Sequence, residues 1–494
     1  MTDAADRVIV LANRAPFRHE WSNGRVVALR SASGLVTALE PLFEAYAGTW
    51  VAHAAGTADL HGGDGMGGIE VPPANPRYRL RYVALPDDQF RGYYYGFANE
   101  GLWPLCHDVD VTPEFRRADY EMYRAANIRF ATIVAEEAGG GSPLVLVQDY
   151  HFALTPRILR ERLPHSRVVA FWHIPWPRCR RFLTCPWALE LVEALVESDV
   201  VGLQTNDDCQ NFLRCVEALL PAAVVDSQQG TIRCRGRVTS VRAYPVGVDC
   251  AHEALRAAPP ITACRDWVRR DLELPADVRL GVGVDRMDYT KGINEKFLAI
   301  ERLLEQQPEL IGRFAFIQIA EPSRDCLSAY RGARDRAFET CQRVNQRFET
   351  SGVRPIRFLE KHHEPSEVYR YYRAADFCHV GSLHDGMNLV AKEFVAARDD
   401  VRGVLVLSQF AGAAQQLRAA ILVNPFRTDE SADAMAQALR MPAIEQTKRM
   451  RILRAHVRSF DASWWAKQIV HDAAHASPAM FRGDEVRRWS TAVA

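Results

Sequence analysis

Short runs of hydrophobic residues alternate with longer amphipathic stretches along most of this 494-residue chain. Each run has about the length of a buried parallel strand and is followed by a turn signal, a pattern typical of α/β proteins. The sequence predicts strands at residues 8–11, 144–147, 168–172, 200–203 and 238–244, and, further along, at 280–284, 314–319, 377–380 and 404–407.

Helical periodicity fills the stretches between these strands. Alternating strands and helices imply right-handed crossovers and parallel sheets, with ligands at the carboxyl ends of the strands. The clearest helical segments are 113–138, 294–305, 325–349 and 389–397, and the charged, glycine-free stretch 444–474 predicts a long terminal helix or a helix pair.

The two sets of strands predict two doubly wound domains facing a central cleft, and the chain length agrees with two domains of similar size. Residues 247–260 separate the sets and are the expected hinge. We therefore expect an N-terminal Rossmann-like domain over 1–247, a C-terminal Rossmann-like domain over 248–443 and a helical segment over 444–494.

Composition narrows the class of partner. The 61 Lys and Arg residues balance the 61 Asp and Glu residues, so no global field favours binding to nucleic acid. The eleven cysteines are odd in number and lack C-x-x-C spacing, which is typical of free thiols in a reducing compartment. With neither a secretory signal pattern nor 18 consecutive apolar residues, we expect a cytoplasmic protein without a membrane partner.

Three short motifs match functional patterns but stand in the wrong surroundings. Gly63, Gly65 and Gly68 form G-x-G-x-x-G, yet the sequence continues into IEVPP and not into a helix, so a surface loop is the better interpretation. The same holds for Asp108, Asp110 and Thr112, whose D-x-D-x-T follows an aromatic turn, and for the polar stretch His362, His363 and Glu364, which does not converge on one metal ion.

Two segments after predicted strands carry the main functional signal. In Asp285–Gly292 (DRMDYTKG), Arg286 and Lys291 are expected in a loop at the carboxyl end of the strand 280–284, where two cations suit a diphosphate. In 383–393 (LHDGMNLVAKE), the chain turns at Gly386 and enters a helix, whose first backbone amides near Asn388 and Leu389 form an anion site.

Nine strings, taken in order, resemble the trehalose-6-phosphate synthases, a family of retaining glycosyltransferases. The likeness extends from about residue 8 to residue 425, and nine motifs in register are a specific signal. The strings are NRAP, LWP, QDYH, HIPWP, GLQT, YPVGVD, DRMDYTKG, SLHDGMNLVAKEF and VLVLSQFAGAA.

The resemblance implies the GT-B fold, in which two Rossmann-like domains face a cleft, with no metal and no cofactor. It implies that the N-terminal domain binds the acceptor, glucose-6-phosphate, and that the C-terminal domain binds the donor, UDP-glucose. The resemblance assigns donor binding to Gly34, His173, Arg286, Lys291, Asp385, Asn388, Leu389 and Glu393, and acceptor binding to Arg14, Tyr94, Trp103, Asp149 and Arg324.

Within that set, the resemblance makes Arg286 and Lys291 the ligands of the diphosphate and Glu393 the ligand of the ribose. Asp385 and His173 are expected to contact the donor glucose. Arg14 and Arg324 are expected to clamp the acceptor phosphate. The expected catalytic group is Asp149, His173, Arg286, Lys291 and Asp385.

Three positions depart from the family pattern and leave alternatives open. Ser33 stands where the family has a glycine, His384 where it commonly has an arginine, and His53 where it has a second tryptophan. These departures leave the nucleotide preference and the acceptor unsettled. A glucosylglycerol-phosphate synthase using ADP-glucose and glycerol-3-phosphate, and a non-catalytic sugar-phosphate sensor, stay as alternatives, and the oligomeric state, a homo-oligomer included, stays open.

Overall fold

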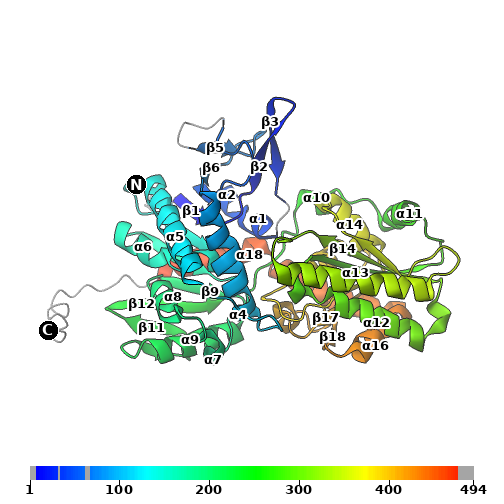
Figure 1. Ribbon diagram of the computed structural model, residues 1–494. Helices are drawn as coiled ribbons and strands as arrows, with labels where there is room; N and C mark the ends of the chain where they lie inside the picture. The colour runs from blue at the N-terminus through cyan, green and yellow to red at the C-terminus, as the bar shows by residue number, and fades with distance from the viewer. Residues whose placement is uncertain (1–6, 32–33, 62–66, 477–494) are drawn as a thin grey trace.

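Two sheets of mainly parallel strands organise this computed structural model, which describes residues 7–31, 34–61 and 67–476 (Figure 1). The first sheet belongs to the N-terminal half of the chain and the second to the C-terminal half. Helices cover both sheets, and the two units lie side by side in Figure 1. The α/β fold with two parallel sheets predicted from the sequence is confirmed.

The first sheet has ten strands in the order β10-β11-β12-β9-β8-β7-β1-β4-β6-β5. Its central strands run parallel, whereas β5 and the β10–β11 pair are antiparallel additions at the two edges. The strands are β1 (Arg7–Leu11), β4 (Ala47–His53), β5 (Gly68–Val71), β6 (Tyr78–Val83), β7 (Leu144–Gln148), β8 (Arg167–Phe171), β9 (Val200–Leu203), β10 (Val224–Asp226), β11 (Thr231–Cys234) and β12 (Arg237–Ala243). A separate hairpin pairs β2 (Phe17–Ser22) with β3 (Arg25–Arg30).

The second sheet has six strands, all parallel, in the order β15-β14-β13-β16-β17-β18. The order steps outward from β13 in both directions, which is the doubly wound topology expected from the sequence. The strands are β13 (Arg279–Arg286), β14 (Phe314–Glu321), β15 (Ile356–Leu359), β16 (Phe377–Val380), β17 (Val404–Ser408) and β18 (Ile421–Val423).

Helices connect the strands of each sheet. In the N-terminal half they are α1 (Gly34–Leu39), α2 (Leu42–Ala45), α3 (Asp87–Phe90), the π-helix η1 (Arg91–Leu102), α4 (Trp103–His107), α5 (Arg117–Ala138), the 3₁₀ turn η2 (Tyr150–Phe152), α6 (Thr155–Arg162), α7 (Cys179–Phe182), α8 (Ala188–Leu195) and α9 (Asn206–Leu219). Further along they are α10 (Glu253–Arg256), α11 (Ile261–Asp271), η3 (Tyr289–Lys291), α12 (Ile293–Gln306), η4 (Pro308–Leu310), α13 (Ser328–Phe348), α14 (Pro365–Ala374), α15 (Leu389–Ala397), η5 (Gly412–Gln415) and α16 (Thr428–Arg440).

The C-terminal segment is a helix pair that spans both halves. Helix α17 (Ala443–Ser459) packs on α15, and Arg454 donates to the carbonyls of Val395 and Ala396 at 3.0 and 2.8 Å. Helix α18 (Ala462–His475) crosses to the first sheet, where the indole of Trp465 donates to the Tyr244 carbonyl at 3.1 Å. The predicted helix pair is confirmed, and it links the two halves.

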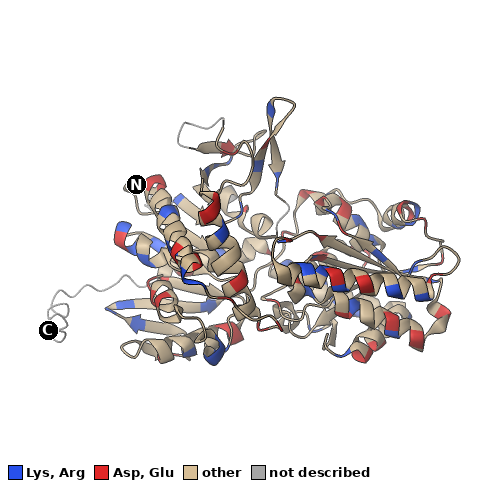
Figure 2. Ribbon diagram, in the orientation of Figure 1, with Lys and Arg blue, Asp and Glu red and all other residues tan. Residues whose placement is uncertain are grey.

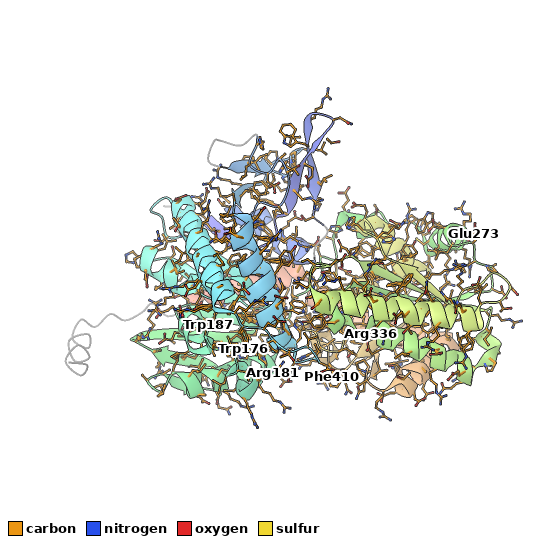
Figure 3. All side chains as sticks on the ribbon, viewed as in Figure 1. Trp176, Arg181, Trp187, Glu273, Arg336 and Phe410 are labelled. Atoms are coloured by element: carbon orange, nitrogen blue, oxygen red, sulfur yellow. The ribbon has the colours of Figure 1, made fainter. Side chains whose placement is uncertain are left out.

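Charged side chains of both signs are interspersed over the helices (Figure 2), in keeping with the neutral composition. Large apolar side chains, Trp176 among them (Figure 3), fill the layers between helices and sheets. Among the described residues, no helix combines the length and the apolar character needed to span a bilayer.

Candidate active site

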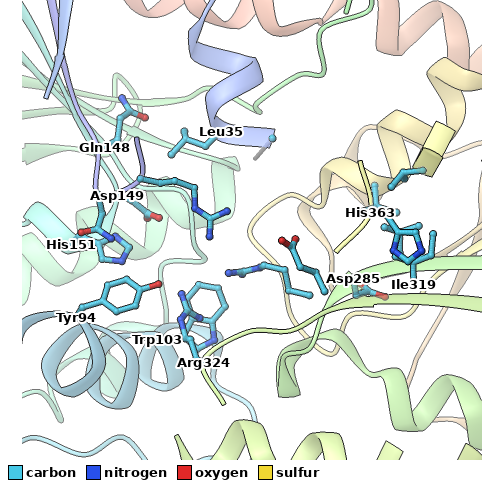
Figure 4. A pocket seen from close by; sticks show the side chains of 18 of the residues that line it. Leu35, Tyr94, Trp103, Gln148, Asp149, His151, Asp285, Ile319, Arg324 and His363 are labelled. Carbon is cyan, nitrogen blue, oxygen red and sulfur yellow. The ribbon is translucent and has the colours of Figure 1, made fainter. Parts of the chain in front are cut away.

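A cavity of about 350 Å³ lies between the two halves, at the carboxyl ends of strands from both sheets (Figure 4). Strands β1 and β7 lead into it from the first sheet, and β13 and β14 lead into it from the second. Seven of the residues assigned from the sequence line this cavity: Arg14, Gly34, Tyr94, Trp103, Asp149, Arg286 and Arg324.

Three arginines from three different strand ends converge on this cavity. Arg14 follows β1, Arg286 ends β13 and Arg324 follows β14. The guanidinium carbons of Arg286 and Arg324 lie 5.4 and 4.7 Å from the centre of the Trp103 ring, so the same aromatic ring supports both cations. The arrangement concentrates positive charge where a phosphate group would fit.

The expected loop position of Arg286 is wrong in one detail. Strand β13 does not stop at residue 284, because its pairing with β14 continues to Arg286 opposite Glu321. Arg286 is therefore held on a strand, which fixes its side chain more firmly than a loop would. Lys291 lies in η3, beyond the strand.

Arg324 is the most constrained of the three arginines. Its backbone has φ +52°, a left-handed conformation that a non-glycine residue adopts at a cost. Its Nη1 donates to the Tyr330 hydroxyl at 2.7 Å and lies 3.6 Å from the buried carboxylate of Asp288. Its Nε has no hydrogen-bond partner within the described residues. Tyr330 and Asp288 thus orient the Arg324 side chain, and its Nε–H stays available to a ligand.

The electrostatics of neighbouring residues confirm that the cavity is positive. Burial would raise the pKa of the Tyr94 phenol, but the charges of Arg324 and Arg14 outweigh burial and lower that pKa below its ordinary value. Burial and the same arginines lower the pKa of His151, so its imidazole is neutral.

Asp149 directly follows β7, the strand beside β1, and Figure 4 shows it pointing toward the cavity. It has φ +75°, and its carboxylate accepts from the backbone amides of Tyr150 at 3.0 Å and His173 at 3.1 Å. Burial raises its pKa to about 6, although these amides and the arginines favour the charged form. A strained, partly buried carboxylate with such a pKa marks a functional position.

A second cavity, of about 190 Å³, adjoins the first and shares Gly34, Val284, Glu321, His363 and Val368 with it. Glu393, the fifth residue of α15, lines this second cavity together with Leu389. The Tyr372 hydroxyl donates to Glu393 Oε2 at 3.1 Å, and burial raises the pKa of Glu393. A carboxylate held in this way suits a ligand that offers hydroxyl donors.

The amino end of α15 lies where the two cavities meet, since Leu389 lines one and Val390 the other. Asn388 caps the helix, its side chain accepting from the Ala391 amide at 3.1 Å. The first amides of a helix have no intrahelical acceptor and carry the positive end of the dipole. This end of α15 is therefore suited to an anion, as the sequence predicted.

Lys291 and Asp385 form an ion pair next to this helix end. Lys291 Nζ lies 2.5 Å from Asp385 Oδ2, and the side-chain amide of Asn388 donates to the same oxygen at 3.1 Å. Although burial opposes ionisation, Lys291 lowers the pKa of Asp385 to about 2. Neither cavity lining includes Lys291, Asp385 or Asn388. In the structure these three residues pair with one another.

The imidazole of His173 lies between two glutamine side chains. Its Nε2 is 2.8 Å from Gln148 Oε1, its Nδ1 is 3.4 Å from Gln204 Nε2, and burial lowers its pKa to about 3, so it is neutral. Its carbonyl oxygen abuts Gly386, where an added Cβ would come within 2.2 Å. The H-D-G turn thus reaches His173 only because residue 386 is glycine.

Two side chains of the second half bond to backbone carbonyls near the cleft. His384 Nδ1 pairs with the carbonyl of His107, so the histidine that departs from the family pattern contacts the N-terminal half. Lys392, which precedes Glu393, is buried and donates to the Val246 carbonyl at 2.6 Å. Burial lowers the pKa of Lys392 to about 7. These bonds tie α15 and its preceding turn to segments outside the second sheet.

His53, the second position that departs from the family pattern, is linked to Tyr94 through the ring of Phe90. Its ring stacks on Phe90 at 4.3 Å, and Phe90 stacks on Tyr94 at 5.0 Å. Burial lowers the pKa of His53 to about 4, so the ring packs as a neutral aromatic. The third departure, Ser33, lies outside the described residues.

Several residues of the site were not found from the sequence. The cavity linings also include Gln148, Tyr150, His151, Asp285, Glu321, His363 and Tyr372. Position offered a signal for two of them, since Glu321 ends β14 and Gln148 ends β7, and strand ends in this fold meet ligands. Tyr372 gave no signal, because its bond to Glu393 depends on how α14 packs against α15.

The three doubtful motifs have the surroundings expected of them, with one correction. Gly68 opens β5 and no helix, Gly63 and Gly65 lie outside the described residues, and Asp108 pairs with Arg181 at 3.2 Å. His362 and His363 lie in a loop, as expected, but His363 is not exposed to solvent. It is buried against Tyr371 and lines both cavities, because α14 folds back beside it. Within the described ranges, no cluster of His, Cys, Asp or Glu suits a metal ion.

Comparison with known proteins identifies relatives of this chain. The model of glycosyltransferase family 20 matches residues 6–475. A protein of Mycobacterium avium (strain 104) named trehalose-6-phosphate synthase is 36% identical over 481 residues, covering 95% of this chain and 96% of the relative.

Solved structures agree. An E. coli structure, described as trehalose-6-phosphate bound with UDP-2-fluoro glucose, superimposes with a TM-score of 0.85 at 30% identity, covering 96% of this chain and all of the other. An alpha,alpha-trehalose-phosphate synthase (UDP-forming) from Burkholderia xenovorans, in complex with glucose-6-phosphate, gives a TM-score of 0.83 at 32% identity over 95% of this chain and all of that one. The likeness confirms the expected GT-B arrangement.

Proposed function

Because the chain belongs to glycosyltransferase family 20, we propose that it is a retaining glucosyltransferase that moves glucose from UDP-glucose to glucose-6-phosphate. The products are trehalose-6-phosphate and UDP. The observation that carries the proposal is the arginine-lined cavity beside the Glu393 cavity, which offers a phosphate site next to a nucleoside site. The names and ligands of the relatives supply the substrate identities.

The donor, in this proposal, lies along the amino end of α15. Glu393 accepts hydrogen bonds from the ribose, and Gly34, packed on Leu389, lets the backbone come close to the nucleotide. Arg286, Lys291 and the amides of Asn388 and Leu389 hold the diphosphate. Asp385 and His173, on either side of Gly386, contact the glucose.

The acceptor occupies the cavity between the halves. Arg14 and Arg324 clamp its phosphate, as the positive potential at Tyr94 supports. Trp103 and Tyr94 shape the wall, and Asp149 faces the sugar from the end of β7. In this scheme residues 1–247 bind the acceptor and residues 248–443 the nucleotide sugar.

The chemistry follows from where charge builds up. As the bond between glucose C1 and the diphosphate oxygen breaks, negative charge grows on the diphosphate, and fixed cations and helix amides stabilise it more in the transition state than before. The acceptor hydroxyl attacks C1 from the same face and passes its proton to the departing phosphate oxygen, so configuration is retained. Holding both substrates in contact supplies much of the rate.

The raised pKa of Asp149 predicts an acidic limb in the pH profile. As a carboxylate it accepts a hydrogen bond from the acceptor, so activity needs the deprotonated form, which exists above the pKa of about 6. We expect kcat/KM for the acceptor to fall about tenfold per pH unit below that value. Steady-state rates between about pH 5 and pH 8 would measure this limb.

The acceptor phosphate also titrates at about pH 6, so a control must separate its titration from that of Asp149. The control variant is Asp149→Asn. The variant should have lower activity overall and a flatter acidic limb. An acidic limb of unchanged pKa and steepness in Asp149→Asn would assign the titration to the substrate and not to Asp149.

Tyr372 is predicted to position Glu393 for the donor. Tyr372→Phe removes the hydroxyl bonded to Glu393 at 3.1 Å, so the donor KM should rise about three- to tenfold while kcat changes little. Tyr369→Phe is a matched control, since Tyr369 lines the same cavity and makes no such bond. Equal donor KM values in Tyr372→Phe and the wild type would contradict the positioning role.

A screen of donors and acceptors tests the function itself. The purified protein is incubated with UDP-, ADP- or GDP-glucose and with glucose-6-phosphate or glycerol-3-phosphate, and the products are identified by mass. We expect a disaccharide phosphate from UDP-glucose and glucose-6-phosphate. Glucosylglycerol phosphate alone would favour the alternative synthase, and acceptor binding in calorimetry without turnover of any nucleotide sugar would favour a sensor.

A further inference from the structure

An arginine-rich hollow lies at the opposite edge of the second sheet from the catalytic cleft. It has a volume of about 590 Å³ and is formed where strands β13, β16 and β17 begin, with helices α11, α15, α16 and α17 around it. Strand β13 spans the sheet between them, with Arg279 at the hollow and Arg286 at the cleft. Figure 1 shows α11 at the outer end of this half, away from the first sheet.

Five arginines and two aspartates line this hollow: Arg265, Arg279, Arg398, Arg402, Arg440, Asp376 and Asp400. Asp376 is shared by Arg265 at 3.0 Å and Arg279 at 3.1 Å, and Asp400 is held by Arg398 at 2.9 Å. Asp399, outside the lining, is paired with Arg373 at 3.0 Å. The lining therefore carries a surplus of three positive charges.

The two remaining arginines have donor capacity to spare. The side chains of Arg402 and Arg440 are exposed and make no hydrogen bond or ion pair in the described part of the chain. They come from different elements, Arg402 from the loop before β17 and Arg440 from the last turn of α16. Both side chains line one hollow although they come from separate segments, unlike charges along one solvated helix face.

A helix end adds further donors to the hollow. Helix α17, of 17 residues, begins at Ala443, which lines the hollow, and no side chain caps this end. Free amides and the positive end of the helix dipole favour an anion there. Together with Arg402 and Arg440, the site has the mixture of forked guanidiniums and backbone amides that recognises phosphate oxygens.

We propose that this hollow is a second anion site, separate from the catalytic cleft, that binds a phosphorylated small molecule. Its volume falls within the range of small-ligand pockets, and the arginine surplus matches a phosphate monoester or a diphosphate. The inference does not depend on the reaction proposed for the cleft.

Calorimetry with inorganic pyrophosphate on the full chain tests the site. The wild type should bind two pyrophosphates, one in the cleft and one in the hollow. Arg402→Gln/Arg440→Gln should lose the second or weaken it about tenfold or more, with the cleft site kept. Arg286→Ala, which removes a cation that the proposal assigns to the diphosphate in the cleft, should do the reverse. Both substituted hollow residues are exposed, so the variant should fold, and its melting temperature checks that it does.

The matched control is Arg336→Gln/Arg451→Gln, which removes the same charge from two exposed arginines outside the hollow (Figure 3 labels Arg336 on α13). This control should bind as the wild type does. Either of two results would overturn the proposal: a wild type with a single pyrophosphate site that is lost in Arg286→Ala, or unchanged binding in Arg402→Gln/Arg440→Gln.

Discussion

Replacing Lys291 with alanine is expected to lower kcat about 100- to 1,000-fold, with much smaller changes in the KM of either substrate. The reason is that, in the proposed scheme, its ammonium group faces the diphosphate, whose negative charge is greatest as the glucosyl bond breaks. Lys291 is held by Asp385 at 2.5 Å, so the cation is placed beside the amino end of α15. Steady-state kinetics with both substrates varied measure the effect.

Loss of the ion pair alone must be separated from loss of the catalytic charge. Lys291→Ala leaves Asp385 buried without its main partner, which costs about 3–5 kcal/mol of stability. Lys296→Ala is the matched control, because Lys296 is also a buried lysine, paired with Asp285. We expect similar losses of melting temperature but a far smaller loss of kcat in the control. Full kcat in folded Lys291→Ala would contradict the assigned role.

Arg324→Ala is expected to raise the KM for glucose-6-phosphate about 10- to 100-fold, the loss of one or two charged hydrogen bonds. The guanidinium is supported by Trp103 at 4.7 Å and oriented by Tyr330 at 2.7 Å, so little else in the cavity would replace it. The dissociation constant of UDP should stay within a factor of about two, since the donor contacts lie at α15.

The comparison variant for Arg324 is Arg336→Ala on helix α13, an exposed arginine outside both cavities. It should leave both substrate constants at their wild-type values. If the acceptor KM were the same in Arg324→Ala as in the wild type, Arg324 would not belong to the acceptor pocket.

The elements with the strongest periodicity could be predicted closely from the sequence. Helix α15 has the predicted bounds of 389–397, and the central strands β1, β7, β9 and β16 lie within one residue of their predicted positions. Such strands are buried on both faces and appear as continuous apolar runs. Helix α5 was predicted four residues too early, because residues 113–116 form an irregular lead into it.

Elements at the edges of the first sheet were not predicted. Strands β10 and β11 are short and partly exposed, so they lack a clear apolar run. The π-helix η1 was missed because its sequence, RGYYYGFANEGL, holds three glycines and reads as a loop. Its conformation depends on tertiary packing against α5, which local propensity does not contain.

The site residues, like the helices and strands, divide into those that the sequence predicted and those that tertiary packing places. The family resemblance assigned Arg14, Asp149, Arg286 and Arg324 to the site, and the fold brings these four residues to one cavity. The bond from Tyr372 to Glu393 and the burial of His363 arise from packing between α14 and its neighbours, over sequence separations that no local pattern encodes. The domain boundaries at 247 and 443 and the cytoplasmic location stay predictions.

The location of the leaving nucleotide is the central claim, and a crystal of the full chain grown with UDP tests it most directly. The diphosphate should lie within hydrogen-bonding distance of Arg286 and Lys291, at the amino end of α15, with the ribose on Glu393. UDP bound elsewhere, out of reach of all three side chains, would contradict the proposed site and the chemistry built on it.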